Sequence, residues 1–219
     1  MHEPTDVTPR FRNHYRPEEY FSYDIRAGVI RAPTGARMLT IPEEFLMGIH
    51  EALEDETGAA APVILYQCGR WWGRRMAQRM AAEVRQFYRL DAGDLHVGAY
   101  LQILRRTWSL RGWGRLDVNF DLQSQGFIEV QIDHSVYSEV VGNLGRPSEA
   151  LVSGILASLV GDMAGRDLEC AQTECKSNGD SRSTFLIGMS SRIEVIHAWV
   201  KQGKPHGQIV TDIRDGSLV

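Results

Sequence analysis

The sequence contains little cysteine: Cys68, Cys170 and Cys175 are the only three in 219 residues. Three irregularly spaced cysteines are too few for a disulfide framework, and the first residues lack the apolar core of a signal peptide. The chain also has no run of about 18 apolar residues, which is the length that a membrane span needs. We therefore expect a cytoplasmic protein with no membrane span.

Positive charge is not in excess either. The chain has 24 Lys and Arg residues against 28 Asp and Glu residues, which gives a net charge of −4. A surface that binds nucleic acid normally carries an excess of basic residues, so we predict no nucleic-acid partner. The composition, 43% hydrophobic and 24% charged, is that of an ordinary globular protein.

The common catalytic signatures are missing as well. The sequence has no glycine-rich dinucleotide or nucleotide loop, no H-E-x-x-H and no C-x-x-C. It has seven histidines, but none are spaced three or four residues apart, so no helix carries a histidine pair for a metal. We expect no catalytic residues, no cofactor and no metal, and we do not favour an enzymatic function.

Helical periodicity is strong in the first half of the chain. The pattern predicts helices at about residues 43–57, 60–88 and 94–111. The second helix has a largely apolar position every four residues: Cys68, Trp72, Met76, Met80 and Val84. Gly69 and Gly73 lower the helix propensity of that segment, which predicts close packing against another backbone. In the third helix we expect Asp94 as the N-cap and Leu104 and Trp108 on the buried face.

After the third helix, the apolar residues recur at every second position instead of every third or fourth. Alternating apolar residues from 116 to 122 and from 128 to 132 predict an antiparallel hairpin with one buried face. Further patterns predict a helix at about 148–163, strands at about 166–173 and 184–188, and a last helix that begins at Ser190 or Ser191. Two short strands are expected around the turn at residues 33–35.

These elements predict one α/β (α+β) domain. Its antiparallel sheet should have about four to five strands and be covered mainly on one face by helices. We expect a polar N-terminal arm at 1–22, the domain itself at 23–203, and a weakly patterned C-terminal tail at 204–219.

Two blocks of sequence resemble one family. The first is "GVIRAPTGARMLTIPEEFLMGIHEALEDETGAAAPVILYQCGRWWGRRMA", and the second runs from "GRLDVNF" through "IDHSVYSE" to "AGRDLECAQTECKSNGDSRSTF". Together they cover about residues 25–190 and are similar to the 4-vinyl reductase domain family. That fold occurs in sensor domains of aromatic-responsive bacterial activators, in a bacteriochlorophyll-pathway protein and, distantly, in TRAPP vesicle-tethering subunits.

The resemblance also indicates what this chain has lost. Sensors of the family carry E-x-x-C-x-x-x-G-x-x-x-C-x-F in the last hairpin, and its Glu and two Cys help to bind a structural zinc ion. In this register the chain has Gln172, Cys175, Gly179, Ser183 and Phe185. The helix before the hairpin has no cysteine, and Glu149 is the nearest substitute for the remaining ligand. One cysteine with a glutamine and a serine does not make a zinc site, which commonly has four thiolate or imidazole ligands.

A ligand pocket is the second implication of the resemblance. The sensors anchor a phenol-type hydroxyl with a histidine and a tryptophan, and the best register places Trp108 and Ile132 at those positions. The pocket should therefore hold a more apolar ligand, or Trp108 fills it; plain packing of these aromatic residues is the alternative. The candidate ligand-binding residues are Tyr100, Leu104, Trp108, Phe120, Val130, Ile132 and, at the mouth, His134.

These observations favour a non-catalytic sensor or adaptor for an apolar or aromatic small molecule. It would act through an unidentified protein partner, and the family resemblance and the many apolar helix residues suggest a homodimer. One alternative is a tetrapyrrole vinyl reductase or its accessory protein, although hydride chemistry requires a cofactor. Another is an assembly or scaffold protein with a closed pocket.

Overall fold

The computed structural model describes residues 13–217, and its centre is a four-stranded sheet. The strands are β4 (Arg115–Asn119), β5 (Phe127–Asp133), β6 (Glu169–Glu174) and β7 (Ser183–Gly188), in the order β4-β5-β7-β6. All neighbouring pairs are antiparallel. The predicted hairpin is confirmed, since Leu116 pairs with Ile132 and Val118 with Val130.

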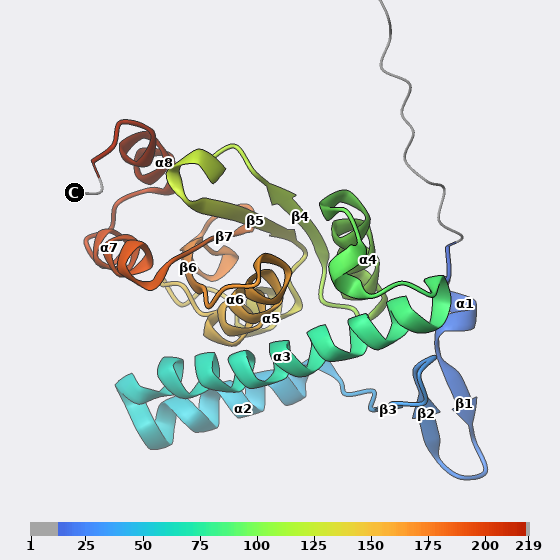
Figure 1. The fold of residues 1–219 in the computed structure, drawn as a ribbon. Coiled ribbons are helices and arrows are strands. Elements are labelled where there is room, and N and C mark those ends of the chain that lie inside the picture. Colours follow the sequence, from blue (N-terminus) through green and yellow to red (C-terminus); the bar gives the residue numbers. More distant parts are fainter. Residues whose placement is uncertain (1–12, 218–219) are drawn as a thin grey trace, which may run out of the picture.

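A smaller sheet lies near the N-terminus and is separate from the main one (Figure 1). It is a meander of β1 (Ser22–Asp24), β2 (Val29–Arg31) and β3 (Arg37–Met38). The two strands predicted around the turn at 33–35 are β2 and β3. The fold is therefore mixed helix and strand, as the sequence predicts.

The helices are α1 (Pro17–Tyr20), α2 (Glu43–Thr57), α3 (Ala61–Tyr88), α4 (Val97–Leu110), α5 (Val136–Val141), α6 (Ala150–Ala164), α7 (Ser190–Lys201) and α8 (His206–Arg214). Five of the helices, α2, α3, α4, α6 and α7, were predicted, whereas α1, α5 and α8 were not. Short 3₁₀ turns occupy 58–60, 92–94, 123–125 and 176–178.

The predicted N-cap of α4 was wrong. Asp94 belongs to a 3₁₀ turn, and His96 is the N-cap, because its Nδ1 accepts a hydrogen bond from the Ala99 amide at 3.1 Å. An imidazole nitrogen here satisfies a backbone donor that a helix start leaves without a partner.

Helix α6 lies between the sheet and α3 and is buried along most of its length. Its crossing with α3 depends on glycine, as predicted for Gly69 and Gly73. A Cβ on Gly73 would stand 2.7 Å from the Ile155 carbonyl oxygen, and one on Gly69 would overlap the Leu151 carbonyl oxygen. Gly154 of α6 meets the backbone of α3 in the same way. The close approach of the two backbones compensates for the low helix propensity of glycine.

The sheet separates two hydrophobic clusters. The larger cluster contains Val130 and Ile132 of β5 and residues of α3, α4 and α6. On the opposite face, Phe127 of β5 and Leu186 of β7 pack against residues of α7 and α8. Most of the apolar core therefore lies on one face, and the smaller layer of α7 and α8 covers the other (Figure 1).

Leu122 does not share a face with Leu116 and Val118, contrary to the predicted alternation. Strand β4 ends at Asn119, whose side-chain oxygen accepts a hydrogen bond from the Asp121 amide at 2.9 Å. The chain turns there, and Leu122 enters the smaller cluster.

Helix α8 lies inside the segment predicted to be a C-terminal tail. Ile209 and Ile213, four residues apart, are buried in the smaller cluster. His206, at the start of α8, forms a 2.9 Å hydrogen bond through Nδ1 with the Thr173 hydroxyl.

The expected N-terminal arm is described only from residue 13. Its residues 1–12, and residues 218–219 of the expected tail, lie outside the described residues. No helix between residues 13 and 217 combines the length and the apolar character that crossing a membrane requires.

Candidate functional site

Five of the predicted ligand-binding residues meet in the larger cluster. Tyr100, Leu104 and Trp108 recur every four residues, so α4 presents them on one face. Val130 and Ile132 alternate along β5 and point to the same side of the sheet. All five are buried. The five residues therefore belong to one buried apolar cluster, in which α4 packs against β4.

The two remaining predicted residues lie at the edges of this site. Phe120 follows the end of β4 and is partly buried against the same cluster. His134 follows β5 with a φ of 54°, and its side chain is 84% exposed. Its Nδ1 lies 3.4 Å from the Glu139 carboxylate. His134 therefore stands outside the apolar centre.

Trp108 occupies the middle of the site. It is the largest fully buried side chain in the described residues, with 1% exposure. Its indole N–H donates a 2.9 Å hydrogen bond to the Trp113 carbonyl oxygen, so the polar edge of the ring has a partner. The ring also contacts the Trp113 ring, with centroids 5.8 Å apart. A ligand that entered this space would have to displace the indole.

Buried polar side chains connect the N-terminal segment to the helices that border the larger cluster. The Tyr20 hydroxyl donates a hydrogen bond to the Glu83 carboxylate at 2.7 Å and accepts one from Arg111 at 3.1 Å. Burial raises the pKa of the Glu83 carboxyl above its ordinary value. The N-terminal segment is thereby attached to both α3 and α4.

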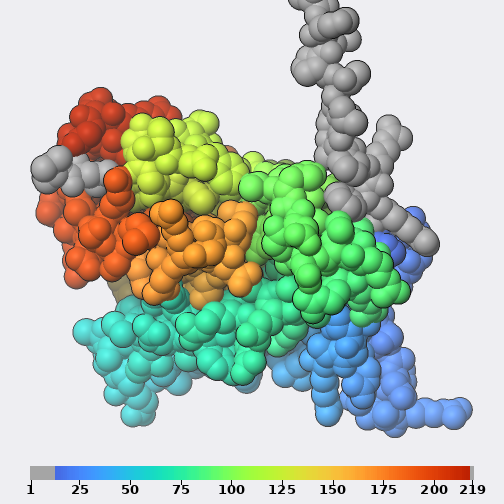
Figure 2. Space-filling model, in the orientation of Figure 1, coloured from blue at the N-terminus to red at the C-terminus, as the bar shows by residue number. Residues whose placement is uncertain are grey.

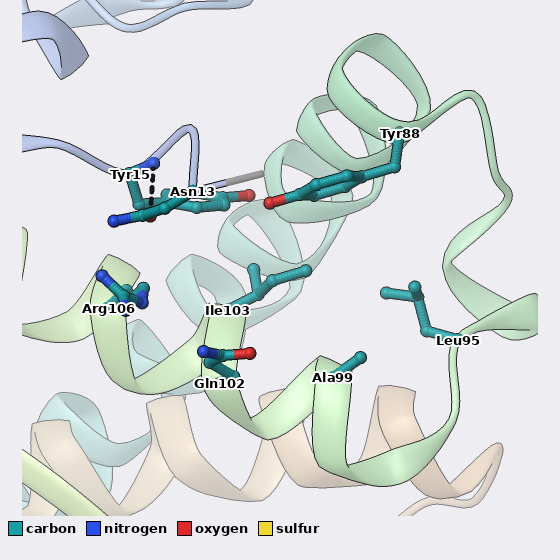
Figure 3. Close-up of a pocket in the computed structure, with 8 residues that line it drawn as sticks. All are labelled: Asn13, Tyr15, Tyr88, Leu95, Ala99, Gln102, Ile103 and Arg106. Carbon is teal, nitrogen blue, oxygen red and sulfur yellow. Dashed lines mark hydrogen bonds between the residues drawn. The ribbon is translucent and has the colours of Figure 1, made fainter. Parts of the chain in front are cut away.

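The same segment covers the outer side of α4 and leaves one small pocket (Figure 3). Asn13, Tyr15 and Tyr88 border it on one side, and Gln102 and Arg106 of α4 border it on the other. Its volume is about 20 Å³. That is room for about one water molecule, so this pocket is not a ligand site.

His134 lines a polar cleft of about 250 Å³. Arg115 pairs with Asp133 at 2.5 Å, and Lys176 pairs with Glu139 at 2.9 Å. These exposed pairs neutralise much of the charge in the cleft, and such pairs contribute little to stability.

The residues in the zinc-ligand register gather around one buried carboxyl. Glu149, which is 0% exposed, accepts a 2.6 Å hydrogen bond from Ser135 and a further one from Ser183. The Gln172 amide nitrogen lies 3.3 Å from the same carboxyl group, and the Cys175 sulfur lies 3.7 Å from it. The positions of the expected zinc ligands are therefore joined by hydrogen bonds.

Burial raises the pKa of the Glu149 carboxyl, although hydrogen bonds from Ser135 and Ser183 lower it in part. No basic side chain is among the groups that shift its pKa most. Within residues 13–217, no group of three or more His, Cys, Asp or Glu side chains is placed to hold a metal ion.

Substitution of Glu149 by glutamine is expected to flatten the pH dependence of stability. A carboxyl whose pKa is raised on folding contributes stability below its unfolded-state pKa, which is about 4.3, and loses that stability as pH rises toward the folded-state pKa. The free energy of unfolding of the wild type should therefore fall, relative to Glu149→Gln, by up to about 1.4 kcal/mol per pH unit in that range. Urea unfolding of both proteins at about pH 5 to 8 measures the difference. A constant difference across that range would contradict the raised pKa.

Protein purified without added metal is expected to contain no stoichiometric zinc. In agreement with that, Cys175→Ser should cost no more than about 1 to 2 kcal/mol. A serine hydroxyl can replace the contacts of the Cys175 sulfur with Ser177, at 2.9 Å, and with Ser148, at 3.7 Å. Elemental analysis that finds about one zinc ion per chain would refute the prediction.

Comparisons with known proteins support the fold. No family model and no curated protein matches the chain. Among solved structures, the phenol-responsive sensory domain of the transcription activator PoxR, solved with phenol, matches with a TM-score of 0.63 and 16% identity. The match covers 78% of this chain and 86% of that one. The resemblance predicted from the sequence is therefore confirmed at the level of the fold.

Two further matches are too weak to support a conclusion about this chain. A vinyl-4-reductase family protein from Methanocaldococcus jannaschii has a TM-score of 0.46 and 15% identity, over 68% of this chain and 82% of its own. A trafficking protein particle complex subunit 3 from Naegleria fowleri, covalently bound to palmitic acid, has a TM-score of 0.45 and 14% identity, over 68% and 94%.

Proposed function

We propose that this chain is a non-catalytic sensor or adaptor domain that binds an apolar or aromatic small molecule and acts through a protein partner. The observation that carries the proposal is the position of Trp108. It is fully buried on α4, in the apolar cluster that also contains Leu104, Val130 and Ile132. The fold of a phenol-responsive sensory domain supports the proposal.

The surroundings of Trp108 define the class of ligand. Leu104, Val130 and Ile132 offer only hydrocarbon. The Tyr100 hydroxyl donates to the Leu159 carbonyl oxygen at 3.3 Å, and burial raises the pKa of this phenol, so it is uncharged at neutral pH. A neutral, flat molecule fits this environment, because burial of an unpaired charge costs several kcal/mol or more. The ligand would take the place of the Trp108 ring.

A scaffold with a closed pocket is the second candidate function. It is favoured by the complete burial of Trp108 and by the hydrogen bond of its indole N–H to the Trp113 carbonyl oxygen. In that case the surface of the domain would carry the function.

We also propose a homodimer, with α2 or α3 as the contact. Phe45 and Ile49 of α2 and Ile64 and Trp71 of α3 are large apolar side chains with 37 to 59% exposure. The helices α2 and α3 lie side by side and form one face of the molecule (Figure 1 and Figure 2). Exposed apolar groups of this kind often mark an interface. Sedimentation at micromolar concentration should give about twice the chain mass of 24.7 kDa, and a species of 24.7 kDa alone would contradict the dimer.

Native mass spectrometry of the purified protein tests the proposed function. We expect a fraction of the protein to retain a neutral, apolar molecule, or to take up an added one such as naphthalene, with one ligand per chain. Protein that contains no ligand and takes up none of a panel of neutral aromatic compounds would favour the scaffold.

A further inference from the structure

A second cavity lies away from Trp108. It is a groove of about 590 Å³ between the first turns of α3 and α6, strand β6 and the end of α7. Ligand pockets usually have volumes of about 300 to 1,000 Å³, so this groove can hold a molecule with one or two rings.

The walls of the groove are mostly apolar. Pro62 and Val63 of α3 face Ala150 of α6 and Val200 of α7. Val63 is a large apolar side chain with 63% exposure. These side chains would gain contacts if a flat apolar group covered them.

The acidic groups of the lining already have partners. The Tyr66 hydroxyl donates a hydrogen bond to Glu169, and Arg70 lies 3.7 Å from the Glu169 carboxylate. Glu149, at the inner end, is bound to the serine hydroxyls described above. Neither carboxyl is therefore suited to hold a cationic ligand.

The rim of the groove that α7 forms carries a basic side chain. Lys201 carries a positive charge there, and His197 stands one helical turn before it. Both side chains are exposed and therefore accessible to a ligand. The rim thus offers an ammonium group beside an imidazole that can form a hydrogen bond.

We propose that this groove binds a small amphipathic anion, an aromatic carboxylate. Its ring would lie against Pro62, Val63 and Val200, and its carboxylate would pair with Lys201 and bond to His197. This site is separate from the space around Trp108 and goes beyond the proposed function, because it takes a charged ligand. A charge on the rim of a groove can stay hydrated on one side, whereas the centre of the core cannot accommodate it.

Calorimetric titration of naphthalene-2-carboxylate into the full chain tests the site. We expect a dissociation constant below about 1 mM, and binding of the neutral analogue naphthalene-2-methanol that is weaker by about fivefold or more. Lys201→Gln should weaken the carboxylate by about fivefold or more, because it removes the charge and keeps the length of the side chain. Val63→Trp, which fills the groove from an exposed position, should weaken it by about tenfold or more.

Two matched variants serve as controls. Val97→Trp places the same ring at the exposed start of another helix, α4, which does not line the groove, and Arg214→Gln removes a charge from the exposed end of α8. Both should bind the carboxylate within about twofold of the wild type.

The proposal is overturned if the wild type binds no carboxylate at about 5 mM, or if the neutral analogue binds equally well and Val63→Trp weakens both equally, which would place both in the groove. Carboxylate binding unchanged in Lys201→Gln would also overturn it, even if Val63→Trp fails to fold. Binding that Trp108→Phe alters and Lys201→Gln does not would assign the carboxylate to the core instead.

Discussion

Gly154→Ala is expected to destabilise the protein by about 3 kcal/mol or more, at or above the upper end of overpacking costs. A Cβ at this position would overlap the Tyr66 carbonyl oxygen and stand 2.8 Å from the Arg70 backbone nitrogen. Both atoms belong to the backbone of α3, so no side-chain rotation can relieve the contact. The crossing of α3 and α6 would have to open along its length.

Gly48→Ala is the matched control for this prediction. Gly48 also lies inside a helix, α2, but a Cβ there would meet nothing within 4 Å. Alanine is the better helix former by about 1 kcal/mol, so Gly48→Ala should leave the free energy of unfolding unchanged or raise it. Urea unfolding of both variants measures the contrast. Equal stability of Gly154→Ala and the wild type would show that the two helices can separate without cost.

Trp108→Ala is expected to cost about 3 to 5 kcal/mol, because it removes a large buried ring and leaves a cavity. It also leaves the Trp113 carbonyl oxygen without the indole donor that now lies 2.9 Å away. Tyr23→Ala is the control, since Tyr23 is 62% exposed and lies outside the proposed dimer contact, so its loss should cost less than about 1 kcal/mol.

Indole should restore part of the stability that Trp108→Ala loses. It has the shape of the missing ring and can donate its N–H to the Trp113 carbonyl oxygen. Mass action predicts a gain of about 2.7 kcal/mol at an indole concentration about 100 times its dissociation constant. The melting temperature of the wild type and of Tyr23→Ala should rise less, because indole would first have to displace the Trp108 ring. A rise of equal size in all three proteins would mean that indole does not enter the vacated space.

Local periodicity was sufficient to predict most of the fold. The alternation at residues 116–120 and 128–132 identified the hairpin, and the four-residue spacing of Met76, Met80 and Val84 identified α3. Gly69 and Gly73 even predicted the close contact with a second backbone, which is α6. These signals were readable because each one lies within a single element.

The misses depended on contacts between distant residues. Ile209 and Ile213 are too few to define a helix without the sheet face on which they pack. The placement of His134 at the mouth stays a prediction, but its exposed side chain follows from a positive φ that the sequence did not indicate, in a turn where the backbones approach so closely that a Cβ on Gly114 would lie 2.6 Å from the His134 carbonyl oxygen. No local pattern indicates such an approach.

The candidate site was likewise predictable from the sequence only in part. The spacing of Tyr100, Leu104 and Trp108 and the alternation of Val130 and Ile132 were enough to predict that these side chains are buried in one cluster. The sequence offered Glu149 only as a possible metal ligand. Its actual partners, Ser135 and Ser183, lie 14 and 34 residues away, and only the packing of α6 on the sheet brings them together.

Nuclear Overhauser contacts between naphthalene and the wild-type protein would test the central claim most directly. If the domain binds neutral aromatic molecules around Trp108, the ligand protons should contact the methyl groups of Leu104, Val130 and Ile132, and the Trp108 indole N–H signal should shift. Contacts confined to Val63 and Val200 in the groove, or none at saturating naphthalene, would contradict the proposed sensor site.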